Sequence, residues 1–100
     1  MIYPEFKTVT VNGVKGVLTR DAFNQDHQTY TFTLPSGTDV ANAKIEYTLD
    51  GTGTFLVEGN EVASGTTTNF DGKTLTLERS AATNVQAKAV SNIEFVFKFQ

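Results

Sequence analysis

The sequence predicts one all-β domain built as a sandwich or a barrel, and two patterns carry this prediction. Apolar and polar residues alternate along most of the chain, and many of the polar partners are threonine. Alternation at a period of two is typical of strands with one buried side and one solvent-facing side. Turn-forming dipeptides separate the alternating runs at intervals of roughly 8–12 residues, which is the spacing found in sandwiches and barrels.

About seven runs show this alternation, and they define the predicted strands. The clearest has four apolar side chains on one face, namely Ile93, Phe95, Phe97 and Phe99. In chain order the predicted strands are 8–11, 14–18, 29–34, 44–49, 54–58, 73–78 and 93–99. The second of them is the weakest, because Gly16 interrupts it and glycine has no side chain to pack.

The same alternation predicts which side of each strand forms the core. The expected core residues are Tyr30, Phe32, Ile45, Tyr47, Leu75, Leu77, Phe95 and Phe97. The interleaved threonines and glutamates should face solvent. A shift of one residue would exchange the two faces of a strand, so the pattern makes a definite statement about burial.

Residues that favour turns mark the ends of these strands. Four dipeptides tolerate positive φ, namely Asn12-Gly13, Asp50-Gly51, Gly59-Asn60 and Asp71-Gly72. Pro35 cannot donate a ladder hydrogen bond and Gly37 tolerates a left-handed turn, so a strand should end at Leu34. The polar segment 20–28 is predicted as a loop. The Ala-rich segment 80–92 is predicted as a long connection with a ragged strand at 85–90, and a short helical turn is the alternative.

The composition fits a single domain and argues against two classes of protein. The chain has 100 residues, the length of one domain. Its net charge is −3 and its basic residues are scattered, which argues against a nucleic-acid-binding surface. It has no cysteine, so disulfides and a cysteine nucleophile are excluded. No apolar run approaches about 18 residues, so we expect no membrane insertion. The first residues lack the pattern of a signal peptide, which leaves export open.

Three successive stretches together give a particular order of strands and turns. They are YTFTLPSGTDV (30–40), IEYTLDGTGTFLVEGNEVASGTTTNFDG (45–72) and KTLTLE (73–78). With them, the chain from Val9 to Phe99 resembles the immunoglobulin-like domains of surface and secreted proteins of gut Gram-negative bacteria. The resemblance implies an immunoglobulin-like β-sandwich of about seven strands, a single domain over 1–100, and an extracellular or cell-surface location. It also implies that the turn after Gly-Thr-Asp links the two sheets, where Asp39 is placed to cap the segment 40–43.

No group of residues in the sequence is typical of an active site, so we expect no enzyme. His27 is the only histidine. A hydrolytic triad needs a carboxylate that holds the histidine, but neighbours in sequence such as Asp26 usually point away, so an exposed loop histidine is expected. Several acidic residues alternate with apolar ones and are expected on solvated sheet faces rather than around a glycosidic bond. They are Glu46, Glu58, Glu78 and Glu94.

No metal ion or other cofactor is expected either. One histidine without any cysteine leaves a zinc site short of ligands. The aspartates of the predicted loops do not form a D-x-D-x-D-G calcium loop. These aspartates are Asp21, Asp26, Asp39, Asp50 and Asp71.

Two aromatic residues outside the alternating runs are the candidates for a ligand-binding surface. Phe23 lies in the polar loop, and Phe70 directly precedes Asp71-Gly72. Each is interpreted first as an anchor that covers the edge of the core. A ligand site, if present, is expected at one end of the sandwich, where loops gather. It would consist of Phe23, Asn24, Asp26, Phe70 and Asp71.

The sequence and the resemblance together predict a non-catalytic accessory or interaction module of a bacterial cell-surface or secreted protein. Its partners would be neighbouring domains of a larger protein or a surface glycan. The alternatives are a carbohydrate-binding module and a structural domain of a phage or pilus-like assembly. A pair of exposed aromatics would favour carbohydrate binding, and an unprotected edge strand would favour assembly by strand addition. A featureless polar surface would favour a spacer.

Overall fold

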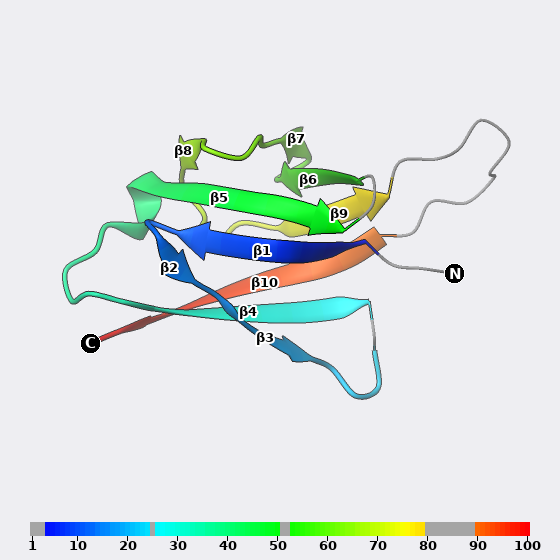
Figure 1. Cartoon of the computed structure of the whole chain (residues 1–100), viewed down its shortest axis with the longest axis horizontal. Coiled ribbons are helices and arrows are strands. Elements are labelled where there is room, and N and C mark those ends of the chain that lie inside the picture. Colours follow the sequence, from blue (N-terminus) through cyan, green and yellow to red (C-terminus); the bar gives the residue numbers. More distant parts are fainter. Residues whose placement is uncertain (1–3, 25, 51–52, 80–89) are drawn as a thin grey trace, which may run out of the picture.

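Two β-sheets packed face to face form the part of the chain that the structure describes (Figure 1). The structure is a computed structural model, and it describes residues 4–24, 26–50, 53–79 and 90–100. One sheet has four strands in the order β2-β1-β5-β8, and the other has six in the order β3-β4-β10-β9-β6-β7. The predicted all-β sandwich is therefore confirmed.

The described residues contain seven strands of four or more residues and three strands of two residues. The longer strands are β1 (Glu5–Val11), β3 (Val17–Arg20), β4 (His27–Leu34), β5 (Ala43–Asp50), β6 (Gly53–Val57), β9 (Leu75–Arg79) and β10 (Val90–Phe99). The short strands are β2 (Val14–Lys15), β7 (Asn60–Glu61) and β8 (Thr67–Thr68), and one 3-10 helix, η1, spans Val40–Asn42. Apart from Val90, which begins β10, the strand predicted at 85–90 lies outside the described residues.

The longer strands bury the side that their alternation predicts. Tyr30, Phe32, Ile45, Leu75 and Leu77 are buried together, as expected. The remaining predicted core residues, Tyr47, Phe95 and Phe97, are only partly buried against that cluster. The interleaved threonines and glutamates of these strands are exposed or half-buried.

The partial burial of the last strand follows from the extent of its pairing. β10 pairs with β4 in parallel along its length, but its antiparallel pairing with β9 ends at Ile93 opposite Leu75. Beyond this position one side of the strand has no β9 neighbour. The exposed fraction accordingly rises along the inward face of β10, from 6% at Ile93 to 49% at Phe99. Tyr47 of β5 is also partly exposed, and its hydroxyl donates to the carbonyl of Val62.

The chain crosses from one sheet to the other at Gly16, between β2 and β3. β2 pairs with β1 in the four-stranded sheet, whereas β3 pairs with β4 in the six-stranded sheet. A Cβ atom at Gly16 would lie 2.8 Å from two carbons of the Phe32 ring, closer than non-bonded carbon atoms approach each other in proteins. Glycine therefore lets the backbone pass directly over this buried ring. The glycine that divides the predicted run 14–18 is what allows this run to contribute to both sheets.

Two hairpins have left-handed turns, one at the predicted residues and one shifted. β1 and β2 are joined by Asn12 (φ 51°) and Gly13 (φ 80°), as predicted. β6 and β7 are joined by Glu58 (φ 51°) and Gly59 (φ 78°), so the prediction of Gly59-Asn60 was wrong by one residue. Asn60 instead begins β7, opposite Val57.

A short capped segment links β4 of one sheet to β5 of the other. The Asp39 carboxylate accepts hydrogen bonds from the Ala41 N–H at 3.0 Å and from the Asn42 amide at 2.9 Å. The Asn42 amide, and then the Ala41 N–H, hold the pKa of Asp39 below its ordinary value. The predicted cap at Asp39 is therefore confirmed, and it lies where the chain changes sheet.

Replacing Gly16 with alanine should lower the free energy of unfolding by about 1–3 kcal/mol, the usual cost of overpacking a core. The reason is the overlap of the added methyl group with the Phe32 ring. Lys15→Ala, which shortens an exposed side chain one residue earlier, should change stability by less than about 0.5 kcal/mol. Urea denaturation of both variants measures the difference. Equal stability would show that the crossing does not require glycine.

Candidate functional site

The structure does not bring the two groups of candidate residues together. Phe23, Asn24 and Asp26 lie in the loop between β3 and β4, which leads into the first residue of β4. Phe70 and Asp71 lie between β8 and β9. The Phe70 N–H donates at 3.5 Å to the carbonyl of Val40, the first residue of η1, which follows β4 in the chain. The two loops are at opposite ends of the sandwich (Figure 1). The joint patch expected from the sequence is therefore not formed.

Phe70 is a core anchor. Its side chain is only 2% exposed, and its ring centroid lies 5.8 Å from that of Phe95. The neighbouring turn is held by the Asn69 side chain, which accepts a hydrogen bond from the Asp71 N–H at 2.9 Å. This agrees with the first interpretation of Phe70 and leaves its ring without access to a ligand.

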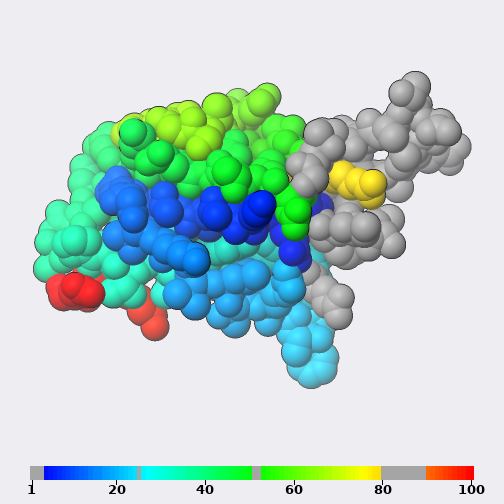
Figure 2. All heavy atoms as spheres, in the orientation of Figure 1, coloured from blue at the N-terminus to red at the C-terminus, as the bar shows by residue number. Residues whose placement is uncertain are grey.

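Phe23 has the opposite environment, because its side chain is fully exposed. The loop around it is nonetheless well bonded. The Asp21 carboxylate accepts the Phe23 N–H at 2.8 Å, and the Asn24 carbonyl accepts the His27 N–H at 3.0 Å. In the space-filling view this loop, in light blue, projects from the body of the molecule (Figure 2). The Phe23 side chain is therefore open to contact with a partner, and it does not anchor the loop to the core.

The base of this loop is tied to the six-stranded sheet. The Asp26 carbonyl accepts the Asn92 N–H of β10 at 2.8 Å. His27, expected in the loop, instead begins β4, and its Nε2 lies 3.8 Å from a carboxylate oxygen of Glu94. The histidine therefore faces an acid on a neighbouring strand and not the adjacent Asp26.

The strand before this loop is also exposed. All four residues of β3 are solvent-exposed, with Val17 at 66% and Leu18 at 38%. Three of the four exposed large apolar side chains in the described residues lie on β3 or its loop; the fourth is Phe99. We call Val17, Leu18 and Phe23 the β3 surface. The sequence contained a signal for it, because two adjacent apolar residues of a strand point to opposite faces and only one of them can face the core.

The outer edge of β3 is open. The Asp21 N–H donates to the His27 carbonyl at 3.4 Å, so by alternation the N–H and C=O groups of Val17 and Thr19 also point to β4. Those of Leu18 and Arg20 point away from the sheet. No strand of the described chain pairs with β3 on that side.

Buried polar groups at the start of β1 form a structural clamp. The Pro4 carbonyl accepts hydrogen bonds at 3.2 Å from the Gln28 amide and at 3.2 Å from the Ser91 hydroxyl, and both of these residues are fully buried. The Tyr30 hydroxyl donates to the other end of the Gln28 side chain at 3.4 Å. Burial raises the pKa of Tyr30, and the nearby Glu5 carboxylate raises it further. These groups satisfy one another and join β1, β4 and β10.

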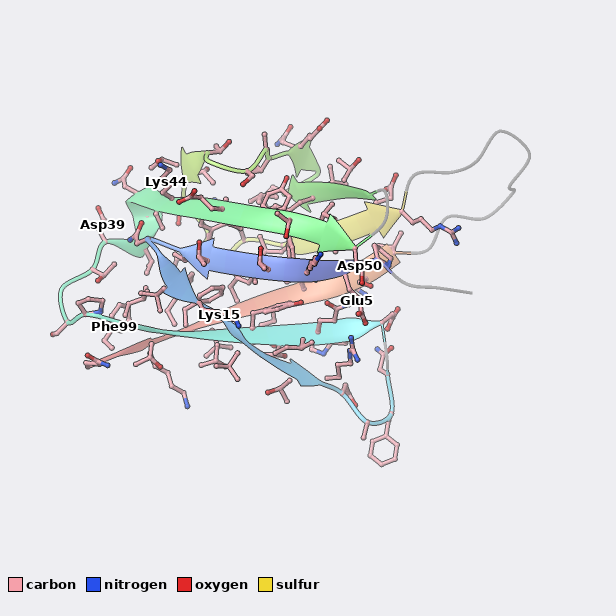
Figure 3. The ribbon with its side chains drawn as sticks, in the orientation of Figure 1. Glu5, Lys15, Asp39, Lys44, Asp50 and Phe99 are labelled. Atoms are coloured by element: carbon pink, nitrogen blue, oxygen red, sulfur yellow. The ribbon has the colours of Figure 1, made fainter. Side chains whose placement is uncertain are left out.

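An ion pair lies beside this clamp. Arg20, at the end of β3, contacts the carboxylate of Glu5, which Figure 3 shows near Asp50. Arg20 also offsets part of the effect of Glu5 on the pKa of Tyr30. The charge of Arg20 is therefore engaged within the domain, across the two sheets.

Three of the four glutamates that alternate with apolar residues lie on strands, and the fourth, Glu58, lies in the turn between β6 and β7. Glu46, Glu58 and Glu94 are exposed and Glu78 is half-buried. Within residues 4–24, 26–50, 53–79 and 90–100, no three His, Asp or Glu side chains gather in a way that would hold a metal ion. No helix in these ranges is long and apolar enough to cross a membrane.

The contrast between the two phenylalanines predicts opposite effects of the same substitution. Phe70→Ala should lower the free energy of unfolding by about 3–5 kcal/mol, because it empties a buried site. Phe23→Ala should change it by less than about 0.5 kcal/mol, because the ring makes no buried contact. Thermal denaturation of the two variants tests this. A clear loss of stability in Phe23→Ala would mean that the ring packs against the domain in solution.

Two comparisons with known proteins, one of families and one of curated sequences, give no match. A scan against models of protein families finds none that matches, and a search of curated proteins finds none with significant similarity. Within the described residues, the β3 surface and its hydrogen-bonded loop are the features on which a proposal of function can be based.

Proposed function

We propose that this chain is a non-catalytic interaction module with an immunoglobulin-like fold, an accessory domain of a bacterial cell-surface or secreted protein, and that its β3 surface makes the contact. The observation that carries the proposal is the fully exposed Phe23 on a loop held by its own hydrogen bonds. Burying a phenylalanine side chain contributes about 1.5–3 kcal/mol. A partner that covers Phe23 would gain this free energy.

The conformation of the loop strengthens this argument. Side chains and loops that become ordered on binding cost free energy, so a contact on an already ordered loop binds more tightly. The Asx-type hydrogen bond from the Phe23 N–H to Asp21 and the backbone bonds of Asp21, Asn24 and His27 hold the loop backbone before any partner arrives. Val17 and Leu18 lie on the strand that precedes this loop, and its pairing with β4 holds their backbone in the same way.

The immunoglobulin-like assignment draws support from the link between the sheets. The capped segment after Gly37-Thr38-Asp39 joins β4 to β5 across the sandwich, which is where such domains change sheet. Neighbouring domains of a larger protein or a surface glycan are the partners this class implies. A location at the cell surface or outside the cell follows from the same resemblance.

A second candidate function is that of a structural domain that assembles by strand addition. The open edge of β3, with its outward N–H and C=O groups, favours it. Carbohydrate binding is less favoured, since Phe70 is buried and Phe23 has no second aromatic beside it in the described structure. A glycan site would have to use Phe23, Asn24 and Asp26 alone.

An array of bacterial and host surface glycans that also carries the immobilised chain itself tests the contact role of Phe23. The labelled parent protein should bind at least one probe, and Phe23→Ala should lose that binding while keeping its melting temperature. Phe99→Ala is the matched control, because Phe99 is also exposed but lies at the other end of the sandwich (Figure 3). Binding that survives Phe23→Ala, or no binding at all, would contradict the proposal. Hydrolysis of any glycan would contradict its non-catalytic part.

A further inference from the structure

We infer that the β3 edge binds a second copy of this chain, whose own β3 pairs with it in antiparallel orientation. The result is a two-fold dimer with one sheet continuous across both copies. This inference rests on the proposed function, because it names the partner of the β3 surface. Its evidence is the character of the edge, the register that the edge permits, and the charges at its ends.

β3 is the longest of the four strands that end the two sheets in the described chain. Natural sheets protect their edges with very short strands and with charged residues. The other three edge strands have two residues each, and two of them carry a charge, Lys15 in β2 and Glu61 in β7. β3 has four residues with two exposed apolar side chains, and its one charged residue, Arg20, is engaged by Glu5.

The outward backbone groups of β3 match those of a second copy related by a two-fold axis. Residues that exchange hydrogen bonds in an antiparallel pair lie directly opposite each other. Pairing Leu18 with the second copy's Arg20, and Arg20 with its Leu18, satisfies the outward N–H and C=O groups of both strands. Thr19 then lies on the axis, opposite the second copy's Thr19. This is a non-hydrogen-bonded position, where Cα atoms are about 4.5 Å apart.

The side chains tolerate this register. No like charges lie opposite each other, since Leu18 faces Arg20 and Thr19 faces itself. Val17 lies opposite the second copy's Asp21. Lys15 lies two residues before Val17, and Figure 3 shows it where β2 leads into β3. At each end of the paired strands, Lys15 of one copy and Asp21 of the other therefore carry charges of opposite sign. Each Phe23 loop extends past the start of the second copy's β3, where the exposed Val17 offers apolar area.

The absence of cysteine from the chain allows a direct test of the register. Thr19→Cys places a single thiol on the proposed axis, at a Cα separation that a disulfide can span. Thr33→Cys is the matched control, an exposed threonine on the neighbouring strand β4. Under mild oxidation the first variant should form a covalent dimer at least about tenfold faster than the second. Equal rates would overturn the inference.

A proline substitution tests whether the backbone edge itself makes the contact. Leu18→Pro removes an outward N–H and no hydrogen bond to β4, so the domain should still fold while its edge no longer pairs. Leu18→Ala keeps the N–H and controls for the lost side chain. In sedimentation velocity the mass of the parent and of Leu18→Ala should rise with concentration, whereas Leu18→Pro should remain a monomer. A melting curve confirms that each variant is folded.

The outcomes separate this inference from the proposed function. A parent that is monomeric at every concentration, with no preferential cross-linking of Thr19→Cys, would overturn the dimer. If Phe23→Ala still abolished binding to a glycan, the interaction role would stand and only the identity of the partner would be wrong. Dimerisation that persisted in Leu18→Pro would also overturn the inference, since the contact would then lie elsewhere.

Discussion

The packing of Gly16 against the Phe32 ring determines where β3 lies, and the exposed surface of the domain depends on that position. The chain leaves β2 in one sheet and passes over the inner side of β4, where the absence of a side chain lets it approach the buried ring. It then reaches the far side of β4 and pairs there as the outermost strand. At this position Leu18, which lies opposite Tyr30 of β4, remains 38% exposed.

Contacts between aromatic rings stabilise much of the rest of the core. The Phe95 ring lies between 5.0 and 6.4 Å, centroid to centroid, from five other rings, those of Tyr30, Phe32, Phe55, Phe70 and Phe97. Such pairs contribute about 0.5–1.5 kcal/mol each beyond the burial of their area. On the opposite sheet, Phe6 of β1 contacts the rings of Tyr30 and Phe55 edge-on and so joins the two layers. A core of this kind suits a chain with a modest apolar fraction and no cysteine.

Features that depend on residues close together in the sequence could be predicted, whereas the positions of distant segments relative to one another could not. The buried faces of β4 and β9 follow from alternation, and the Asp39 cap depends on residues within three positions of it. Phe23 and Phe70 look alike in sequence, since each is an aromatic in a polar segment. They differ because the Phe70 loop fills the space beside β10 where β9 has ended, and the Phe23 loop has no such space next to it. Which strand becomes a sheet edge is likewise a property of the whole pairing scheme.

The parallel pairing of β4 with β10 governs how this chain reaches its native state. Residue 27 pairs with residue 92, so the central strands of the six-stranded sheet meet only when distant parts of the chain have come together. Pairings between such distant segments make folding slow. During synthesis β4 emerges long before β10, and until then this Thr-rich strand has no partner on that side. Until β10 is available, the edges of β4 are open to β3 and to other chains, and an unpaired strand edge of this kind favours aggregation.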